Sequence, residues 1–264
     1  MFTIVVSCIA LGAFIGFMAG LLGIGGGVIA VPVLLFLLPK AGVVPEHLTH
    51  VAIATSLAAI ILTSLSSARA HHSRGNIPWH LLTIMLPGFI IGALSAGFIS
   101  SLFSAELLKQ IFAGFLVLMA LQMVFPVKAT EVERSLPAAP YLFLAACIIA
   151  IIAALMGIGG GILLIPFLTW AGVQMRHAIG FSSVTGLMIA LFGSVSYVFA
   201  GWATQGLPEY TLGYIYLPAL LGIVCTSMLT APLGAKAASI WPTARLKKIF
   251  AVMLFFTGIK LALT

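Results

Sequence analysis

Two glycine-rich segments contain the residues of this sequence that are best placed to bind a ligand. They read LGIGGGVIAVP (22–32) and MGIGGGILLIP (156–166), and each lies inside a long apolar run. Because each glycine in a helix interior costs about 1 kcal/mol relative to alanine, the helices are expected to break there. A helix that restarts after such a break presents free backbone N–H groups and the positive end of its dipole. Glycine also lets a ligand approach the backbone, so the pattern predicts an anion site.

Hydroxyl side chains follow each glycine motif at matching positions. Thr55 lies eight residues after His47, and Thr185 lies eight residues after His177. Eight helical residues span about 12 Å, which places both hydroxyls near the depth of the glycine breaks. Hydroxyls can donate hydrogen bonds to an oxyanion without carrying a charge. The residues of the predicted site are Gly25, Gly26, Gly27, Thr55, Ser56, Gly159, Gly160, Gly161, Ser182, Ser183 and Thr185.

Close helix packing is the alternative interpretation of both features, because small residues and Ser or Thr are frequent at helix contacts in membranes. Nucleotide binding does not fit the motifs. Neither copy matches GxGxxG, since Val28 and Ile162 follow the three glycines, and no GK[ST] sequence follows.

The composition is that of a polytopic membrane protein. The chain has 264 residues, of which 62% are hydrophobic and 6% are charged, and its mean hydropathy is +1.25. A water-soluble domain of this length needs more polar surface than this sequence supplies. The cysteines, Cys8, Cys147 and Cys225, stand alone in apolar runs, so we expect core thiols and no metal site. We expect no nucleic-acid partner, since a basic excess in a membrane protein first reports topology.

The sequence repeats itself. Besides the glycine motifs, LKQIFAGFLVLMA (108–120) matches LKKIFAVMLFFTG (246–258). The matches predict a first repeat over 1–127 and a second over 140–264, joined by a polar cytoplasmic linker over 128–139. The predicted elements are a hairpin over 2–39 with spans over 47–68, 79–103 and 107–126, then a hairpin over 140–171 with spans over 178–200, 211–234 and 246–264.

The first segment of each repeat is too long to cross the membrane once. As a single helix, the 38 residues of the first segment would extend about 57 Å, nearly twice the thickness of the hydrocarbon core. Broken at its glycines, the segment can enter the membrane and return. The predicted fold is therefore all-α, with two inverted repeats that each contain a re-entrant hairpin and three transmembrane helices.

The basic residues favour this arrangement. If both hairpins return to their starting sides, nine basic residues share one side of the membrane: Arg69, Arg74, Lys128, Arg134, Arg176, Lys236, Arg245, Lys247 and Lys248. Three lie on the other side: Lys40, Lys109 and Lys260. Single crossings throughout would divide them seven to five. Because cytoplasmic loops are rich in Lys and Arg, the uneven division predicts that both termini lie outside the cytoplasm and that the repeats have opposite orientations.

No carboxylate is available at the centre of the membrane for a proton or sodium relay. All five acidic residues lie in loops or at the ends of spans: Glu46, Glu106, Glu131, Glu133 and Glu209. An anion needs no coupling ion to leave the cell, because the negative interior drives it outward, so export is favoured over uptake. His50 and His177 are candidate proton shuttles, and Arg69 is a candidate for attracting anions at the inner mouth.

The residues resemble those of a known family. The duplicated GIGGG followed by proline (Gly23 to Pro32 and Gly157 to Pro166), with ATS (54–56) and SSVTG (182–186) after it, is similar to the sulfite exporter TauE/SafE family of membrane permeases. The resemblance covers almost the whole chain. It implies transport of sulfite, organosulfonates or related small anions across a bacterial cytoplasmic membrane, without a prosthetic group. The two hydroxyl clusters differ in sequence, so the site is expected to be asymmetric.

Several alternatives stay open from the sequence. The cargo can be another small anion such as a carboxylate, and transport can be proton-coupled import. A sensor or scaffold without flux would leave the paired glycine breaks without a role. An intramembrane enzyme lacks support, because no buried acid, histidine pair or activated nucleophile is visible. The expected partners are the lipid bilayer and a small anionic substrate, and the apolar surface is also compatible with a homodimer.

Overall fold

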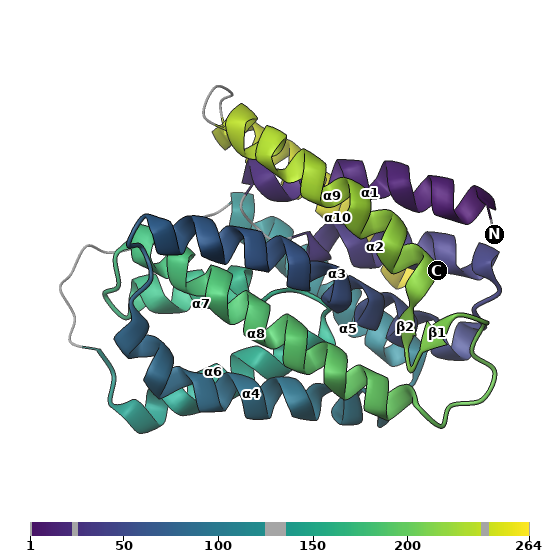
Figure 1. Ribbon diagram of the computed structural model, residues 1–264, viewed down its shortest axis with the longest axis horizontal. Helices are drawn as coiled ribbons and strands as arrows, with labels where there is room; N and C mark the ends of the chain where they lie inside the picture. Colours follow the sequence, from purple (N-terminus) through teal and green to yellow (C-terminus); the bar gives the residue numbers. More distant parts are fainter. Residues whose placement is uncertain (1, 23–25, 125–135, 239–242, 264) are drawn as a thin grey trace.

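The computed structural model describes residues 2–22, 26–124, 136–238 and 243–263, and it is built almost entirely of helices (Figure 1). Gly25, which belongs to the predicted site, and most of the linker lie outside the described residues. The helices are α1 Phe2–Leu22, α2 Gly27–Leu37, α3 Pro45–Ser73, α4 Trp79–Ser101, α5 Ala105–Val124, α6 Ala139–Leu155, α7 Gly161–Trp170, α8 Met175–Gly201, α9 Leu217–Ala238 and α10 Thr243–Leu263. A 3-10 turn, η1 (Leu38–Ala41), follows α2, and two short strands precede α9.

Four of the described helices are long and apolar enough to cross a membrane, namely α3, α4, α5 and α8. They overlap the segments predicted as spans over 47–68, 79–103, 107–126 and 178–200. Several shorter apolar helices, including α2, α6 and α7, pack among them. The chain is therefore an all-α polytopic membrane protein, as its composition predicts.

At each GIGGG motif, one helix ends before the first glycine and the next begins at the last one. In the first, α1 ends at Leu22 and α2 begins at Gly27. In the second, α6 ends at Leu155 and α7 begins at Gly161. Gly157 and Gly160 have φ angles of 67° and 74°, in the left-handed region that glycine adopts without steric cost, and these two residues end one helix and start the next.

The helix contacts fix the direction of α7. Gly88 and Gly92 of α4 face the carbonyl groups of Phe143 and Cys147 in α6, so α4 and α6 run side by side in the same direction. Since α8 also runs parallel to α4 (Figure 1), α7 has to lead from the inner end of α6 back to the end where α6 began.

The same argument applies to the first glycine-broken segment. Gly12 and Gly16 of α1 pack against Ile223 and Ser227 of α9, again in parallel. The helix α9 starts at the end of the molecule where α3 also starts, and α2 connects α1 to that end (Figure 1). Both short helices therefore begin in the interior of the molecule and run outward.

Helix pairing follows a regular scheme. The helix α1 packs on α9, as α4 packs on α6, while α3 packs on α8 and α5 on α10. If each helix of the first predicted repeat is exchanged with its counterpart in the second, the same set of helix pairs results. An inverted duplication would require this symmetry. The division into two repeats, with its boundaries and inverted orientation, stays a prediction.

The segment predicted as a span over 211–234 begins differently. Its first six residues contain a β-hairpin, in which Thr211 pairs with Tyr216 and Leu212 with Ile215, and α9 starts only at Leu217. The turn requires Gly213, whose φ is 54°. Tyr214, Ile215 and Tyr216 of this hairpin are buried against the helix bundle, and a buried strand needs apolar residues. In the sequence, these apolar residues therefore look like the start of a membrane helix.

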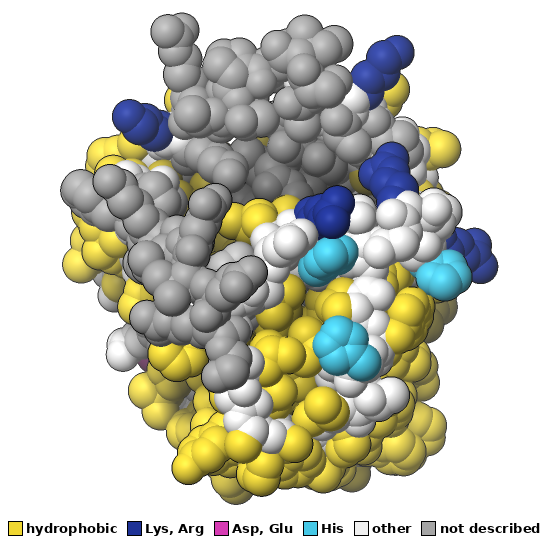
Figure 2. Space-filling model, turned by 90° about the vertical axis from the view of Figure 1, so that its left-hand side faces the viewer, with side chains coloured by type: hydrophobic (Ala, Val, Ile, Leu, Met, Phe, Trp, Pro, Cys, Tyr) yellow, Lys and Arg dark blue, Asp and Glu magenta, His cyan; other side chains and the backbone are white. Residues whose placement is uncertain are grey.

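The two ends of the molecule differ in charge. Figure 1 shows both chain termini at one end, with the 74–78 loop at the other. Figure 2 looks at the second end, where Lys, Arg and His side chains gather beside apolar surface. Arg69 and Arg74 at the end of α3 are exposed there.

The close packing of α4 on α6 can be tested with one substitution. A Cβ atom at Gly92 would collide with the carbonyl oxygen of Cys147, so Gly92→Leu is expected to force the helices apart and to destabilise the protein by about 1–3 kcal/mol. Gly114→Leu in α5 is the matched control, because nothing lies within 4 Å of its Cβ position. The measurement is the thermal melting temperature of the purified protein in detergent. Equal melting temperatures for the two variants would contradict the packing described.

Candidate functional site

The two glycine motifs meet in the interior of the molecule. A Cβ atom at Gly27, the first residue of α2, would collide with the carbonyl oxygen of Gly157 in the second motif. That same oxygen accepts a hydrogen bond of 2.8 Å from the hydroxyl of Ser56 on α3. The structure thus brings Gly27, Ser56 and the second glycine motif into one cluster, although they are far apart in the sequence.

The start of α7 has the geometry of a helix N-terminus that faces inward. Gly160 precedes the helix, and its carbonyl accepts hydrogen bonds from the N–H groups of Leu163 (3.1 Å) and Leu164 (2.9 Å). The N–H groups of Gly161 and Ile162, in the first turn, have no acceptor within the helix. A Cβ atom at Gly161 would lie 3.5 Å from the hydroxyl oxygen of Ser182, so Gly161 and Ser182 of the predicted site are neighbours.

Ser64 of α3 lies near Gly159, and the sequence analysis did not include it in the predicted site. A Cβ atom at Gly186 of α8 would lie 2.7 Å from the carbonyl oxygen of Gly159, and 3.4 Å from the hydroxyl of Ser64 on α3. Ser64 therefore adds a hydroxyl to the group around the second motif. A signal for it exists in the sequence, because Ser64 and Ser194 occupy matching positions when the repeats are aligned on Thr55 and Thr185.

The hydroxyls in the second half donate to their own helix. Ser182 donates to the carbonyl of Ile179 (2.9 Å), Ser183 to that of Gly180 (2.7 Å), and Thr185 to that of Phe181 (3.1 Å). Such bonds satisfy a hydroxyl locally in an apolar interior. An oxyanion can recruit these donors only if the hydroxyl hydrogens turn away from the carbonyls of α8.

Thr55 has a different partner. Its hydroxyl oxygen accepts a hydrogen bond of 3.0 Å from the backbone N–H of Tyr216, at the end of the β-hairpin. Thr55 and Ser56 are both fully buried. The hydroxyls of the first half therefore hold other segments in place, Thr55 the hairpin and Ser56 the second glycine motif, whereas those of the second half bond within α8.

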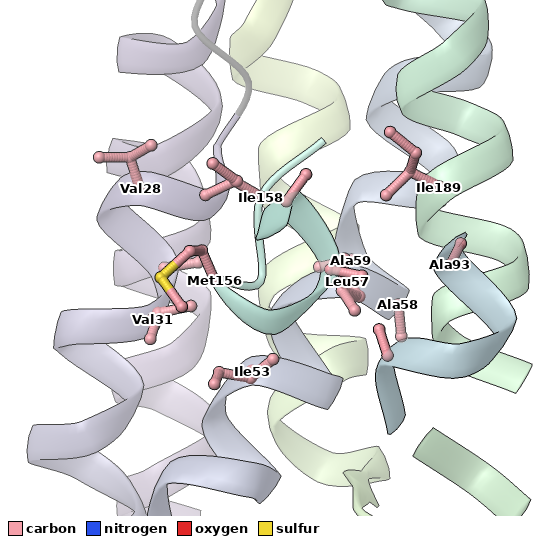
Figure 3. Packing of buried hydrophobic residues seen from close by; sticks show 14 of the residues in the cluster. Val28, Val31, Ile53, Leu57, Ala58, Ala59, Ala93, Met156, Ile158 and Ile189 are labelled. Atoms are coloured by element: carbon pink, nitrogen blue, oxygen red, sulfur yellow. The ribbon is translucent and has the colours of Figure 1, made fainter. Parts of the chain in front are cut away.

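The space around the glycine motifs is closely packed. Figure 3 shows Met156 and Ile158 of the second motif among Val28 and Val31 of α2 and Ile53 of α3. Beside them lies a cavity of about 10 Å³, lined by residues that include Gly26 and Ser56, with room for about one water molecule. In this closed arrangement, the two glycine motifs must separate before an anion can lie between them.

A larger cavity lies elsewhere and is apolar. It has a volume of about 540 Å³ between α5 and α7, and Leu118, Gln122, Ile162 and Pro166 are among its lining residues. Among the residues that the structure describes, no group of three or more His, Cys, Asp or Glu side chains is placed to hold a metal ion.

The secondary candidates lie nearer the ends of the molecule. His50 is buried in α3, and one ring nitrogen, Nε2, lies 3.0 Å from the carbonyl oxygen of Ser100. His177 is half-buried in the first turn of α8, and Arg69 is exposed near the end of α3. The three residues therefore do not form a single site with each other.

The bond between Ser56 and Gly157 gives a testable contribution to stability. Ser56→Ala removes the donor and leaves a buried carbonyl oxygen without this partner, which is expected to cost about 1 kcal/mol. Ser183→Ala is the control, since its hydroxyl bonds only a carbonyl of its own helix. Chemical denaturation of both variants in detergent measures the difference. A larger loss for Ser183→Ala than for Ser56→Ala would be inconsistent with a bridging role for Ser56.

Comparisons with known proteins place this architecture among membrane transporters. The family model described as "Sulfite exporter TauE/SafE" matches residues 8–261. A probable membrane transporter protein of Haemophilus influenzae is 38% identical over 263 residues, which cover 100% of both chains. A probable membrane transporter protein of Methanocaldococcus jannaschii is 27% identical over 86% of this chain and 84% of its own. No solved structure matches.

Proposed function

The chain belongs to the sulfite exporter TauE/SafE family, and from this premise we propose that it exports a small sulfur-containing oxyanion such as sulfite or an organosulfonate. It is a multi-pass membrane transporter and not an enzyme. The proposal concerns the cargo, the direction of transport and the site that binds the cargo.

The observation that carries the proposal is the contact between the two glycine motifs. Gly27 lies against the carbonyl of Gly157, and the helices that start at the motifs, α2 and α7, both run outward from the interior. Two helix N-termini that converge in the interior of an apolar protein form a favourable environment for an anion. Irregular backbone at this depth is otherwise expensive, because the membrane supplies no water to satisfy it.

Transport follows from opening one side of this contact at a time. When α2 and α7 separate, the N–H groups at their first turns become available to an oxyanion. Ser56 is then released from the carbonyl of Gly157 and can donate to the oxyanion instead, and Ser182 can do so by rotating away from Ile179. An anion bound in this way carries its charge past the apolar residues that close the resting arrangement.

Charge and potential support export. The end of the molecule with Arg69 and Arg74 is proposed to face the cytoplasm, in keeping with the positive-inside rule, and both termini then lie outside. A potential of 100 mV, negative inside, drives each negative charge outward with about 2.3 kcal/mol. Net export of an anion that keeps a net negative charge in transit therefore needs no further energy source.

The cargo can be assigned by competition. In proteoliposomes that contain the purified protein, efflux of radiolabelled sulfite is measured against an excess of sulfate, a short organosulfonate or acetate. We expect the organosulfonate to inhibit sulfite efflux strongly and acetate to inhibit it weakly, because a pyramidal or tetrahedral oxyanion presents three oxygens to the converging N–H groups. Stronger inhibition by acetate than by the organosulfonate would instead assign a carboxylate as the cargo.

A further inference from the structure

A second group of buried polar side chains lies away from the glycine motifs, at the end of the molecule where α3 begins. His50 of α3 is 4% exposed and Tyr197 of α8 is fully buried. In the described part of the chain, the His50 Nδ1 and Tyr197 hydroxyl atoms are buried without a hydrogen-bond partner. Buried polar atoms are nearly always paired, so an unpaired one in a native protein requires an explanation.

The bond on the other side of the His50 ring fixes its tautomer. Its Nε2 lies 3.0 Å from the carbonyl oxygen of Ser100, and a carbonyl can only accept, so Nε2 carries the hydrogen. In neutral His50, Nδ1 is then a bare acceptor with no donor beside it. Binding a proton at Nδ1 changes only the charge of the ring, because the bond from Nε2 to Ser100 is kept in both forms.

The groups around His50 can accommodate its charge. Tyr214 of the hairpin turn stacks on the His50 ring with 5.2 Å between centroids, and an aromatic face stabilises a cation. His47, one turn earlier on α3, has its ring 6.1 Å from the ring of Tyr214. Tyr197 of α8 also contacts the Tyr214 ring, and the start of α5 lies beside α3 at Thr49. On α5, Glu106 is ion-paired with Lys109 at 2.8 Å, so its charge is already compensated locally.

The β-hairpin connects His50 to the proposed anion site. Tyr214 stacks on His50, and two residues later the N–H of Tyr216 donates to Thr55. His50 and Thr55 lie on successive turns of α3, and one short hairpin covers both. A change at His50 that moves Tyr214 therefore also acts on the bond that holds Thr55.

We propose that His50 binds a proton at Nδ1 that is carried across the membrane together with the anion. This inference rests on the proposed function and deepens it, because it makes the transported unit an anion plus one proton. With that proton the sulfite dianion still carries one net negative charge outward, whereas a monovalent organosulfonate moves without net charge. The positive ring attracts the anion toward α3 and is neutralised by it. When the anion leaves, the proton leaves Nδ1, and His50 returns to the neutral tautomer that donates to Ser100.

The test measures proton and anion movement together. Methanesulfonate stays ionised at neutral pH, so any proton that accompanies it has been carried by the protein. Proteoliposomes are loaded with radiolabelled methanesulfonate or sulfite and a pH-sensitive dye, and efflux is started by dilution. We expect the lumen to become alkaline as methanesulfonate leaves, and we expect efflux to slow as the pH is raised from 6 to 8, because fewer His50 rings then carry the proton at Nδ1.

Two substitutions separate His50 from its neighbour. His50→Gln keeps an N–H donor for Ser100 but cannot take up a proton, so the pH dependence and the alkaline shift are expected to disappear. His47→Gln changes the half-buried histidine one turn away and is expected to behave like the wild type.

The outcomes keep the two proposals distinct. Anion efflux from the wild type without a change in luminal pH overturns the role of His50 and leaves the transport function intact, whether or not the variants fold. Proton movement that persists in His50→Gln overturns it as well. An absence of efflux for both anions at every pH overturns the proposed function itself.

Discussion

Replacing Gly160 with valine is expected to abolish transport while the protein still inserts into the membrane. Gly160 has a φ of 74° immediately before α7, and its Cβ position is 2.7 Å from Cδ1 of Ile189. A β-branched residue is a severe outlier at such a φ angle, so valine must shift the backbone at the start of α7. That shift turns the N–H groups of Gly161 and Ile162 away from the proposed anion position.

A second variant separates backbone conformation from side-chain bulk. Asparagine adopts the left-handed conformation more readily than other non-glycine residues, so Gly160→Asn is expected to retain part of the flux. Gly114→Val is the control for introducing a valine, because nothing lies within 4 Å of the Gly114 Cβ position on α5. Flux is compared after equal amounts of each protein are reconstituted. Wild-type flux in Gly160→Val would remove the second glycine motif from the mechanism.

Replacing Gly27 with valine is expected to have an effect of similar size for a different reason. The φ of Gly27 is helical, but its Cβ position collides with the carbonyl oxygen of Gly157 and lies 2.8 Å from Cδ1 of Ile60. Backbone cannot move aside as a flexible side chain can, so α2 has to separate from the second motif. We expect a loss of stability of about 1–3 kcal/mol and a loss of at least tenfold in flux.

The graded substitution Gly27→Ala tests the same contact. Alanine already places a Cβ atom against the carbonyl, so it is expected to lower flux, whereas Gly114→Ala is expected to leave flux unchanged. Melting temperature and flux are measured on the same preparations. If Gly27→Ala keeps both values at the wild-type level, the two motifs are not in contact during transport.

The helices and their breaks were predictable because they depend on local chemistry. Apolar runs of about twenty residues identify membrane spans, and consecutive glycines interrupt helices whatever surrounds them. The hairpin at 211–216 was missed, because Tyr214, Ile215 and Tyr216 are as apolar as a helix start and are buried only through contacts with distant segments. Hydropathy alone does not distinguish a buried strand from a buried helix.

The contacts within the candidate site were not predictable in the same way. The motifs indicate that Gly27 and Gly157 are unusual, but their direct contact depends on how α2, α3 and α6 pack in three dimensions. The hydroxyls are predicted to bind an anion, and this stays a prediction; in the structure Ser183 bonds to its own helix and Thr55 to the hairpin. Which partner a hydroxyl takes depends on neighbours that the sequence does not place.

The central claim is that the protein moves a sulfur oxyanion through the contact between the glycine motifs. The most direct measurement is the efflux of radiolabelled sulfite from proteoliposomes under an imposed potential, with Gly160→Val as the control. A potential of 100 mV, negative inside, should favour efflux at equilibrium by at least about 50-fold if one net negative charge moves with the anion. The account predicts this potential-driven efflux in the wild type and its loss in the variant. Sulfite efflux that is equal in the wild type, in Gly160→Val and in protein-free liposomes would contradict it.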